Sequence, residues 1–174
     1  MPQGLSHEAI AWIAKIAITL WMIAVAVLDH RHGRIPNRLT GPVFLGVGAY
    51  RVGWEGLWQG DYARLWLLAA WAVVYGLWML NFIGGGDGKF LMAQLALFPS
   101  MEYVAVLAIV LLILTVPLLL WTMRGRSPGA MLRGAWARLQ TGEVLPTQAE
   151  LQAHGKRYAW TYAVPGIVYT WVYW

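Results

Sequence analysis

Two uncharged apolar stretches constrain this chain more than any other feature of its sequence. Residues 65–83 and 103–123 contain no Asp, Glu, Lys or Arg. Because a helix rises about 1.5 Å per residue, each stretch is long enough to cross most or all of a hydrocarbon layer about 30 Å thick. The composition agrees, since 59% of the 174 residues are hydrophobic and only 12% are charged, which lies outside the soluble globular range. The sequence therefore predicts a membrane protein.

Four further apolar stretches are expected to form helices beside these two. They cover residues 10–28, 39–54, 90–98 and 158–174. Twelve tryptophans and eight tyrosines fit the same prediction, because their amphipathic rings favour the interface between membrane and water. We predict an all-α, polytopic membrane protein, a bundle of about six transmembrane helices that forms a single domain over residues 1–174.

The basic residues indicate how this bundle is oriented. Ten of the thirteen fall on one side of the predicted layout: Arg31, Arg34, Arg38, Lys89, Arg124, Arg126, Arg133, Arg138, Lys156 and Arg157. Because cytoplasmic loops of membrane proteins are rich in Lys and Arg, this side is expected to be cytoplasmic, with both termini outside. Asp29 and Asp87 then face the cytoplasm from the inner (cytoplasmic) membrane.

Several functional classes are excluded or disfavoured by the residue types present. The chain has no cysteine, so it has no disulfides, no thiolate zinc site and no cysteine nucleophile. His30 and His32 lie on an expected loop without an HExxH pattern, which argues against a metal site. The net charge of +5 is not gathered into a nucleic-acid-binding module. We expect no metal, no cofactor and no nucleic-acid partner, and no sequence feature defines an oligomeric state.

Two segments allow more than one interpretation. The polar segment 124–157 carries Met131, Leu132, Ala135, Trp136 and Leu139 at helical spacing. We expect a short amphipathic helix on the cytoplasmic membrane surface, either as a simple linker or as a place where substrate docks. Near the N-terminus, residues 24–26 imitate a signal cleavage site, but no basic residue precedes Lys15, so a transmembrane helix is favoured over a cleaved signal.

Two aspartates at the ends of apolar stretches are the candidate functional residues. An ionised carboxylate at the centre of a membrane helix costs about 3 kcal/mol, so acidic residues at this depth suggest function. One alternative is an interfacial ion pair, with Arg31 or Arg34 for Asp29 and with Lys89 for Asp87. The other is a pair of carboxyl groups that share a proton, of which one acts as general base and the other as general acid. Such a pair can activate water for peptide hydrolysis without a metal.

Small and polar residues beside the aspartates have their own interpretations. Gly84 and Gly86 can break the helix and let another segment approach Asp87 closely, or they simply belong to a loop. Pro36 and Asn37 are expected to form a rigid turn that orients Asp29, or merely a helix start. Lys89 can favour the charged form of Asp87, bind the carbonyls of a neighbouring helix, or act only as a topology signal.

Two motifs give the chain a resemblance to a known family. The segments "LDHRHGRIPNRLT" (residues 28–40) and "GGGDGK" (residues 84–89) resemble the two aspartate motifs of the type IV prepilin peptidases, which are GxGD membrane aspartyl peptidases. The resemblance implies an aspartyl endopeptidase of the lipid bilayer that cuts the basic leader of prepilin or pseudopilin precursors at the cytoplasmic face. By the same resemblance, Asp29 and Asp87 are the catalytic pair. The residues that shape the site are Gly84, Gly86, Lys89, Arg34, Pro36 and Asn37.

The chain also departs from many members of that family. It lacks their cytoplasmic insertion with paired Cys-x-x-Cys motifs, so N-methyltransferase activity is not expected. In this respect the chain resembles the short forms that serve tight-adherence pili and archaeal pilin-like systems. Two other functions remain open from the residues alone. One is a small proton-coupled transporter that uses Asp29 and Asp87 as a relay, although no internal repeat supports it; the other is an assembly factor of a secretion system.

Overall fold

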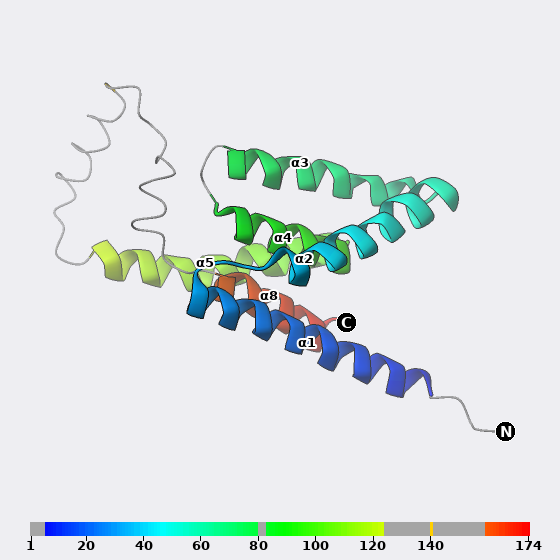
Figure 1. The fold of residues 1–174 in the computed structure, drawn as a ribbon, viewed down its shortest axis with the longest axis horizontal. Helices are drawn as coiled ribbons and strands as arrows, with labels where there is room; N and C mark the ends of the chain where they lie inside the picture. Colours follow the sequence, from blue (N-terminus) through cyan, green and yellow to red (C-terminus); the bar gives the residue numbers. More distant parts are fainter. Residues whose placement is uncertain (1–5, 80–82, 124–139, 141–158) are drawn as a thin grey trace.

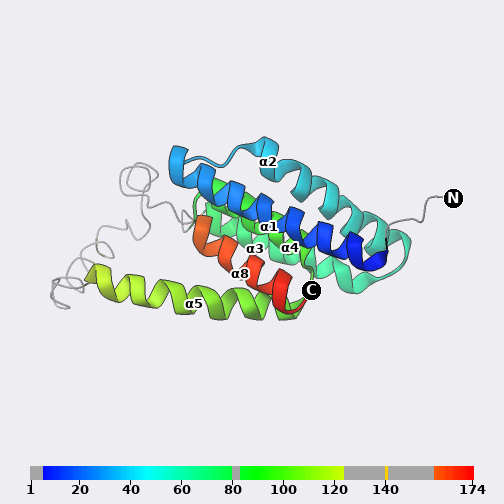
Figure 2. The same cartoon turned by 90° about the horizontal axis from the view of Figure 1, so that it is seen from below.

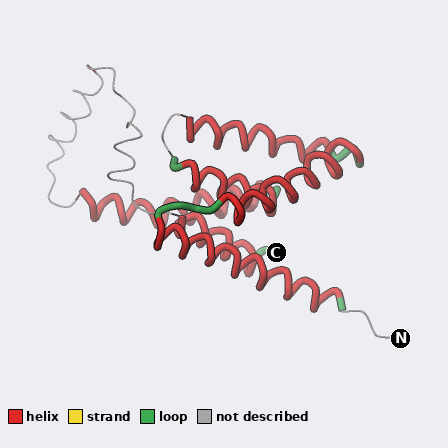
Figure 3. Tube along the Cα trace, viewed as in Figure 1, coloured by secondary structure: helices red, strands yellow, loops and turns green. Residues whose placement is uncertain are grey.

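The computed structural model describes residues 6–79, 83–123, 140 and 159–174, and it shows helices throughout this part of the chain (Figure 3). No strand occurs among these residues, so the all-α prediction is confirmed. The amphipathic helix predicted within residues 124–157 lies, except for Gln140, outside the described residues.

Each predicted apolar stretch overlaps a helix. The α-helices are α1 (His7–His32), α2 (Asn37–Pro42), α3 (Trp66–Met79), α4 (Gly85–Leu97), α5 (Met101–Met123) and α8 (Ala159–Val172). Between α2 and α3 the chain forms two π-helical segments and one 3₁₀ turn, which are η1 (Val43–Val47), η2 (Tyr50–Trp58) and η3 (Tyr62–Leu65). The predicted apolar stretch 39–54 is therefore helical, although much of it is wound more loosely than an α-helix.

The boundaries of α1 follow from its capping residues. Ser6 caps the start, because its side chain accepts a hydrogen bond from the Ala9 N–H at 3.2 Å. At the other end Gly33 adopts a left-handed conformation (φ 64°) and its N–H donates to the Asp29 carbonyl at 2.7 Å. The expectation that His30 and His32 lie on a loop is wrong. Gly33 is the residue that ends α1, so both histidines belong to its last turn.

The glycine-rich segment before α4 is more helical than the sequence suggests. We expected a break from helical structure through Gly84 and Gly86, but α4 already begins at Gly85 and includes Gly86 and Asp87. Only Gly84 is extended (φ −65°, ψ 148°), as the residue that precedes the helix. A glycine inside a helix costs about 1 kcal/mol relative to alanine, and close packing of this turn against neighbouring side chains offsets that cost.

The helices are arranged so that one end of the bundle gathers several helix termini. In Figures 1 and 2, α8 lies alongside α1 and also against α5, while α4 packs between α3 and α2. The chain direction matters, because α1 ends at the same end of the bundle at which α4 and α8 begin (Figure 1). We call this end the site end.

Tryptophans join the helices around α4. The Trp21 indole N–H donates to the Leu39 carbonyl at 2.9 Å, and the Trp21 ring packs edge-on against Phe90. Trp71 of α3 similarly donates to the Met92 carbonyl at 3.1 Å. Phe90 is completely buried, so α4 forms the centre of the core.

The outer surface of the bundle is strongly apolar. Two helical segments, His7–His32 and Tyr62–Met79, are long and apolar enough to cross a membrane, and Met101–Pro117 is a shorter apolar helix. Large apolar side chains are exposed along α1, namely Ile10, Trp12, Ile13, Ile16, Leu20, Ile23 and Val27. Exposed apolar surface of this extent is typical of membrane contact. These helices support a membrane protein.

Candidate active site

Asp29 is a buried carboxylate in the last turn of α1. Its exposed fraction is only 8%. Its Oδ2 accepts a hydrogen bond from the backbone N–H of Ala159 at 3.3 Å, and Ala159 is the first residue of α8. The end of α1 is therefore joined to the start of α8 at this carboxylate. A backbone N–H donor suits the ionised form of a carboxyl group.

Asp87 is a half-buried carboxylate in the first turn of α4. It precedes the apolar run of α4 that begins at Phe90 and lies outside the two segments long enough to cross a membrane. Burial, and secondarily the negative charge of Asp29, raises the pKa of Asp87 from its ordinary value of 3.8 to about 6. The structure thus places the two carboxyl groups within electrostatic reach of each other.

The ion pairs that the structure shows among its described residues join Arg51 and Arg64 to Glu55 and Asp61, at positions away from the two aspartates. The predicted partners were Arg31 or Arg34 for Asp29 and Lys89 for Asp87. Arg34 is exposed and takes part in no ion pair among the residues that the structure describes. Lys89 extends to Asn37 instead, with its Nζ donating to Asn37 Oδ1 at 2.9 Å. The simple interfacial ion pair proposed as an alternative for Asp87 is not formed.

Two glycines allow close packing around Asp87. A Cβ atom on Gly84 would lie 3.1 Å from Asp87 Oδ2, and one on Gly86 would lie 3.3 Å from the Ile35 side chain. Both distances are shorter than ordinary van der Waals contacts. Any side chain at these positions would therefore displace either the carboxyl group or Ile35. These close neighbours explain why both positions require glycine, whether the glycines serve to break the helix or only belong to a loop.

The two sequence motifs contact each other at this site. Gly86 packs on Ile35, and Lys89 bonds to Asn37, so the second motif meets the first at two points. Pro36 precedes α2 with φ −65° and ψ 133°, values that its ring favours. The segment after Asp29 is therefore fixed against the start of α4.

Three further residues connect α8 with the aspartates and with α4, and the sequence does not predict their contacts. Ala159 bonds to Asp29 through its backbone, which no side-chain pattern can reveal. Tyr162 of α8 lies within electrostatic reach of Asp87. Gln94 is fully buried in α4 and donates to the Tyr162 carbonyl at 3.1 Å. Gln94 did carry a signal, because it is the one polar residue in the apolar run 90–98.

The chemistry available here is that of two carboxyl groups. Among the residues that the structure describes, no three His, Cys, Asp or Glu side chains cluster closely enough to hold a metal ion. The raised pKa lets Asp87 keep its proton to a higher pH than an ordinary aspartate does, while Asp29 accepts a backbone hydrogen bond. Paired carboxyl groups with different environments can serve as general acid and general base.

Comparison with known proteins agrees with the two motifs. The model of the type IV leader peptidase family matches residues 16–121, which is more than half of the chain and includes both aspartates. The match ends before α8. Searches among curated proteins and among solved structures gave no match.

Proposed function

Because the chain belongs to the type IV leader peptidase family, we propose that it is a membrane-embedded aspartyl endopeptidase that removes the basic leader from type IV pilin-like precursors. The family assignment implies a peptidase. The observation that supports the aspartyl mechanism is that Asp29 and Asp87 lie within electrostatic reach of each other.

In the proposed reaction Asp29 is the general base and Asp87 the general acid. Asp29 takes a proton from a water molecule, whose oxygen attacks the scissile carbonyl carbon, while Asp87 donates its proton to the carbonyl oxygen. The tetrahedral intermediate then collapses, the C–N bond breaks, and the leaving amine takes the proton from Asp29. Asp87 regains its proton from the hydroxyl group formed at the carbonyl. Bound substrate would exclude bulk water from the site, apart from the attacking water molecule, and further favour the protonated form of Asp87.

The proposed substrate is a prepilin or pseudopilin with a basic leader before an apolar helix. Two acidic groups at one end of the bundle would attract such a leader, and the apolar exterior of the bundle suits a substrate helix that lies in the same bilayer. The two motif contacts, at Gly86 and at Lys89, would hold Asp29 and Asp87 in place while an extended segment binds. We do not expect N-methyltransferase activity.

We further propose a bundle of about six transmembrane helices in the inner membrane, with the site end toward the cytoplasm. Arg34, Arg38 and Lys89 are exposed at this end, which supports the orientation because basic residues accumulate on the cytoplasmic side. The family match favours the peptidase over the proton-coupled transporter and over the assembly factor.

A cleavage assay tests this function directly. The purified chain is reconstituted in vesicles with a synthetic precursor that carries a basic leader and an apolar helix, and products are identified by mass spectrometry. We expect one cut at the junction of leader and helix, unaffected by EDTA. The D29N/D87N double variant serves as the control. No cleavage by the natural chain, or equal cleavage by the double variant, would refute the proposed function.

A further inference from the structure

Gln94 is a fully buried polar side chain at which α4, α5 and α8 meet. Its Nε2 donates to the Tyr162 carbonyl of α8 at 3.1 Å. Its Oε1 accepts a hydrogen bond from the Tyr103 hydroxyl of α5 at 2.5 Å. Gln94 and Tyr103 are both 0% exposed. Because an unpaired amide in apolar surroundings is costly, both partners are needed for this packing.

The segment of α8 that Gln94 contacts is also linked to the aspartates. Tyr162 is three residues from Ala159, less than one helical turn, and the N–H of Ala159 donates to Asp29. Tyr162 is also within electrostatic reach of Asp87. The start of α8 is thus bonded to Gln94 through the Tyr162 carbonyl and to Asp29 through the Ala159 N–H.

Close packing further along α8 fixes its distance from Gln94. A Cβ atom on Gly166 would lie 2.6 Å from the sulfur of buried Met22 and 3.5 Å from the Gln94 side-chain carbonyl carbon. α8 therefore has little room to move toward α1 or α4. Figures 1 and 2 show α8 lying along α1 to its end at the site. A displacement of α8 along its axis would break the bond to Gln94 and the bond to Asp29 together.

We propose that Gln94, held by Tyr103, is a positioning residue for the two aspartates: it fixes α8 so that the Ala159 N–H meets Asp29 and α8 covers Asp87. The importance of this position for catalysis rests on the proposed function. The helix that Gln94 positions lies outside residues 16–121, which the family model matches.

A second hydrogen bond between α5 and α8 provides a matched control. The Ser100 hydroxyl and the Tyr169 hydroxyl lie 2.8 Å apart, and Tyr169 is nearly as buried as Tyr103. Tyr169 lies in the half of α8 away from Ala159. Tyr103→Phe and Tyr169→Phe therefore each remove one buried hydroxyl, but only the first removes support for Gln94.

The experiment compares Gln94→Met, Tyr103→Phe and Tyr169→Phe in the full chain. Leader cleavage gives kcat and KM, and ¹³C NMR of labelled aspartate side chains follows the titration of Asp87. A shift of about 1 Å at a reacting group can cost about 100-fold, so we expect Gln94→Met and Tyr103→Phe to lower kcat at least tenfold with KM changed less than about twofold. Because burial is the main cause of the raised pKa of Asp87, loosening α8 should lower that pKa from about 6 toward 3.8. Tyr169→Phe should leave both unchanged.

Two results would overturn the proposal. One is an unchanged Asp87 titration in both Gln94→Met and Tyr103→Phe; the other is an equal loss of kcat in Tyr169→Phe. If Gln94→Met fails to fold, Tyr103→Phe decides, because it removes a single hydroxyl. The titration requires no substrate. A chain that cleaves no precursor would therefore refute the proposed function, while the NMR result still tests the positioning of α8.

Discussion

Carboxylates at the two ends of the helical bundle have opposite surroundings. At the end formed by η2 and η3, Glu55 lies 2.6 Å from an Arg51 nitrogen and 3.4 Å from an Arg64 nitrogen, and Asp61 lies 3.0 Å from Arg64. At the site end, Asp29 and Asp87 lie within electrostatic reach of each other, and Asp29 accepts a hydrogen bond from a backbone N–H.

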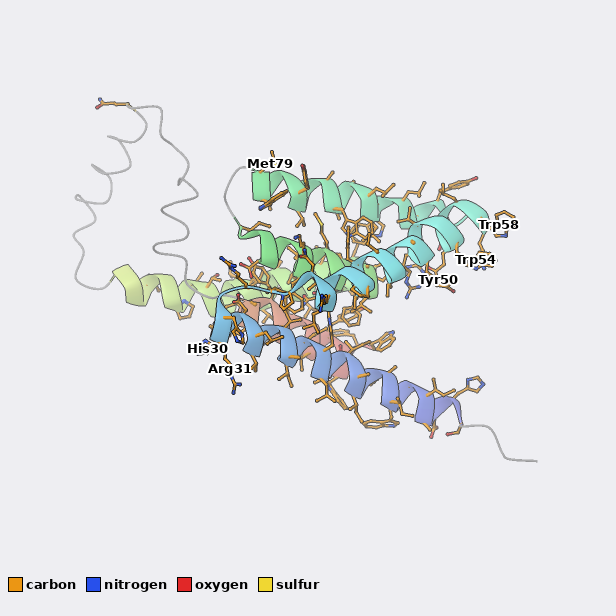
Figure 4. The ribbon with its side chains drawn as sticks, in the orientation of Figure 1. His30, Arg31, Tyr50, Trp54, Trp58 and Met79 are labelled. Carbon is orange, nitrogen blue, oxygen red and sulfur yellow. The ribbon has the colours of Figure 1, made fainter. Side chains whose placement is uncertain are left out.

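Figure 4 marks these two ends with labelled side chains. Tyr50, Trp54 and Trp58 follow one side of η2, and the rings of Trp54 and Trp58 stack at 5.9 Å. His30 and Arg31 lie at the far end, where α1 finishes. Acidic side chains thus form ion pairs with arginines at one end, whereas at the other end the proposed function gives a neighbouring pair of them an acid–base role. The following predictions test this difference.

The largest expected effect is on cleavage. Asp29→Asn should lower kcat/KM about 10²–10⁴-fold, because it removes a general base, and Asp87→Asn should do the same by removing the acid. Glu55→Gln should leave cleavage within about threefold and lower the thermal stability, because it weakens the ion pairs of Glu55 with Arg51 and Arg64. Rates measured in the same vesicles decide, and a comparable loss in Glu55→Gln would remove the distinction between the two ends.

A glycine substitution should have the next largest effect. Gly86→Val would press on Ile35, because even a Cβ atom would lie 3.3 Å away. We expect about 1–3 kcal/mol of destabilisation from overpacking and at least tenfold slower cleavage. Gly46→Val is the control, since nothing lies within 4 Å of a Cβ atom there. Equal behaviour of the two variants would show that the close packing at Gly86 is unimportant.

The burial of Asp87 should make the stability of the fold depend on pH. Asp87 has a folded-state pKa of about 6, above its ordinary 3.8, so its protonated form is favoured by folding. This contribution is fully present below pH 3.8 and is lost as the pH rises through about 6. The thermal stability of wild type should therefore fall as the pH rises from 3.8 to about 6, and the cleavage rate should decline above pH 6. Asp87→Asn should abolish this part of the stability profile, whereas Glu55→Gln should retain it.

The smallest expected effect concerns the contact between the motifs. Lys89→Met and Asn37→Ala each remove the exposed 2.9 Å hydrogen bond. A double-mutant cycle on cleavage rates should give a coupling of about 0.5–1.5 kcal/mol, as for a single hydrogen bond. Additive effects of the two substitutions would mean that this bond does not hold the motifs together during the reaction.

The sequence anticipated the features that depend on local patterns. Hydrophobic stretches located the helices. The two motifs predict Asp29 and Asp87 as a pair, and the fold brings these residues within electrostatic reach of each other. The sequence predicts a helix from residue 90, whereas α4 begins at Gly85. Glycine normally disfavours helix, and the sequence does not show the packing of Gly86 on Ile35. His30 and His32 were placed on a loop because the left-handed turn at Gly33 has no unique sequence signal.

Contacts between distant segments were the least predictable. The Asp29 carboxylate bonds to a backbone N–H 130 residues away, and a backbone donor carries no residue-specific information. Gln94 stood out as a polar residue in an apolar run, but nothing in that run identifies Tyr103 and Tyr162 as its partners. The role of α8 therefore emerges only from the three-dimensional arrangement.

The central claim is that Asp29 and Asp87 form one coupled acid pair. The most direct test is a ¹³C NMR titration of the Asp87 carboxyl group in wild type and in Asp29→Asn. Wild type should titrate with an apparent pKa of about 6, and removal of the neighbouring negative charge should lower this pKa measurably, with the remaining elevation due to burial. An Asp87 titration identical in the two proteins would contradict the account.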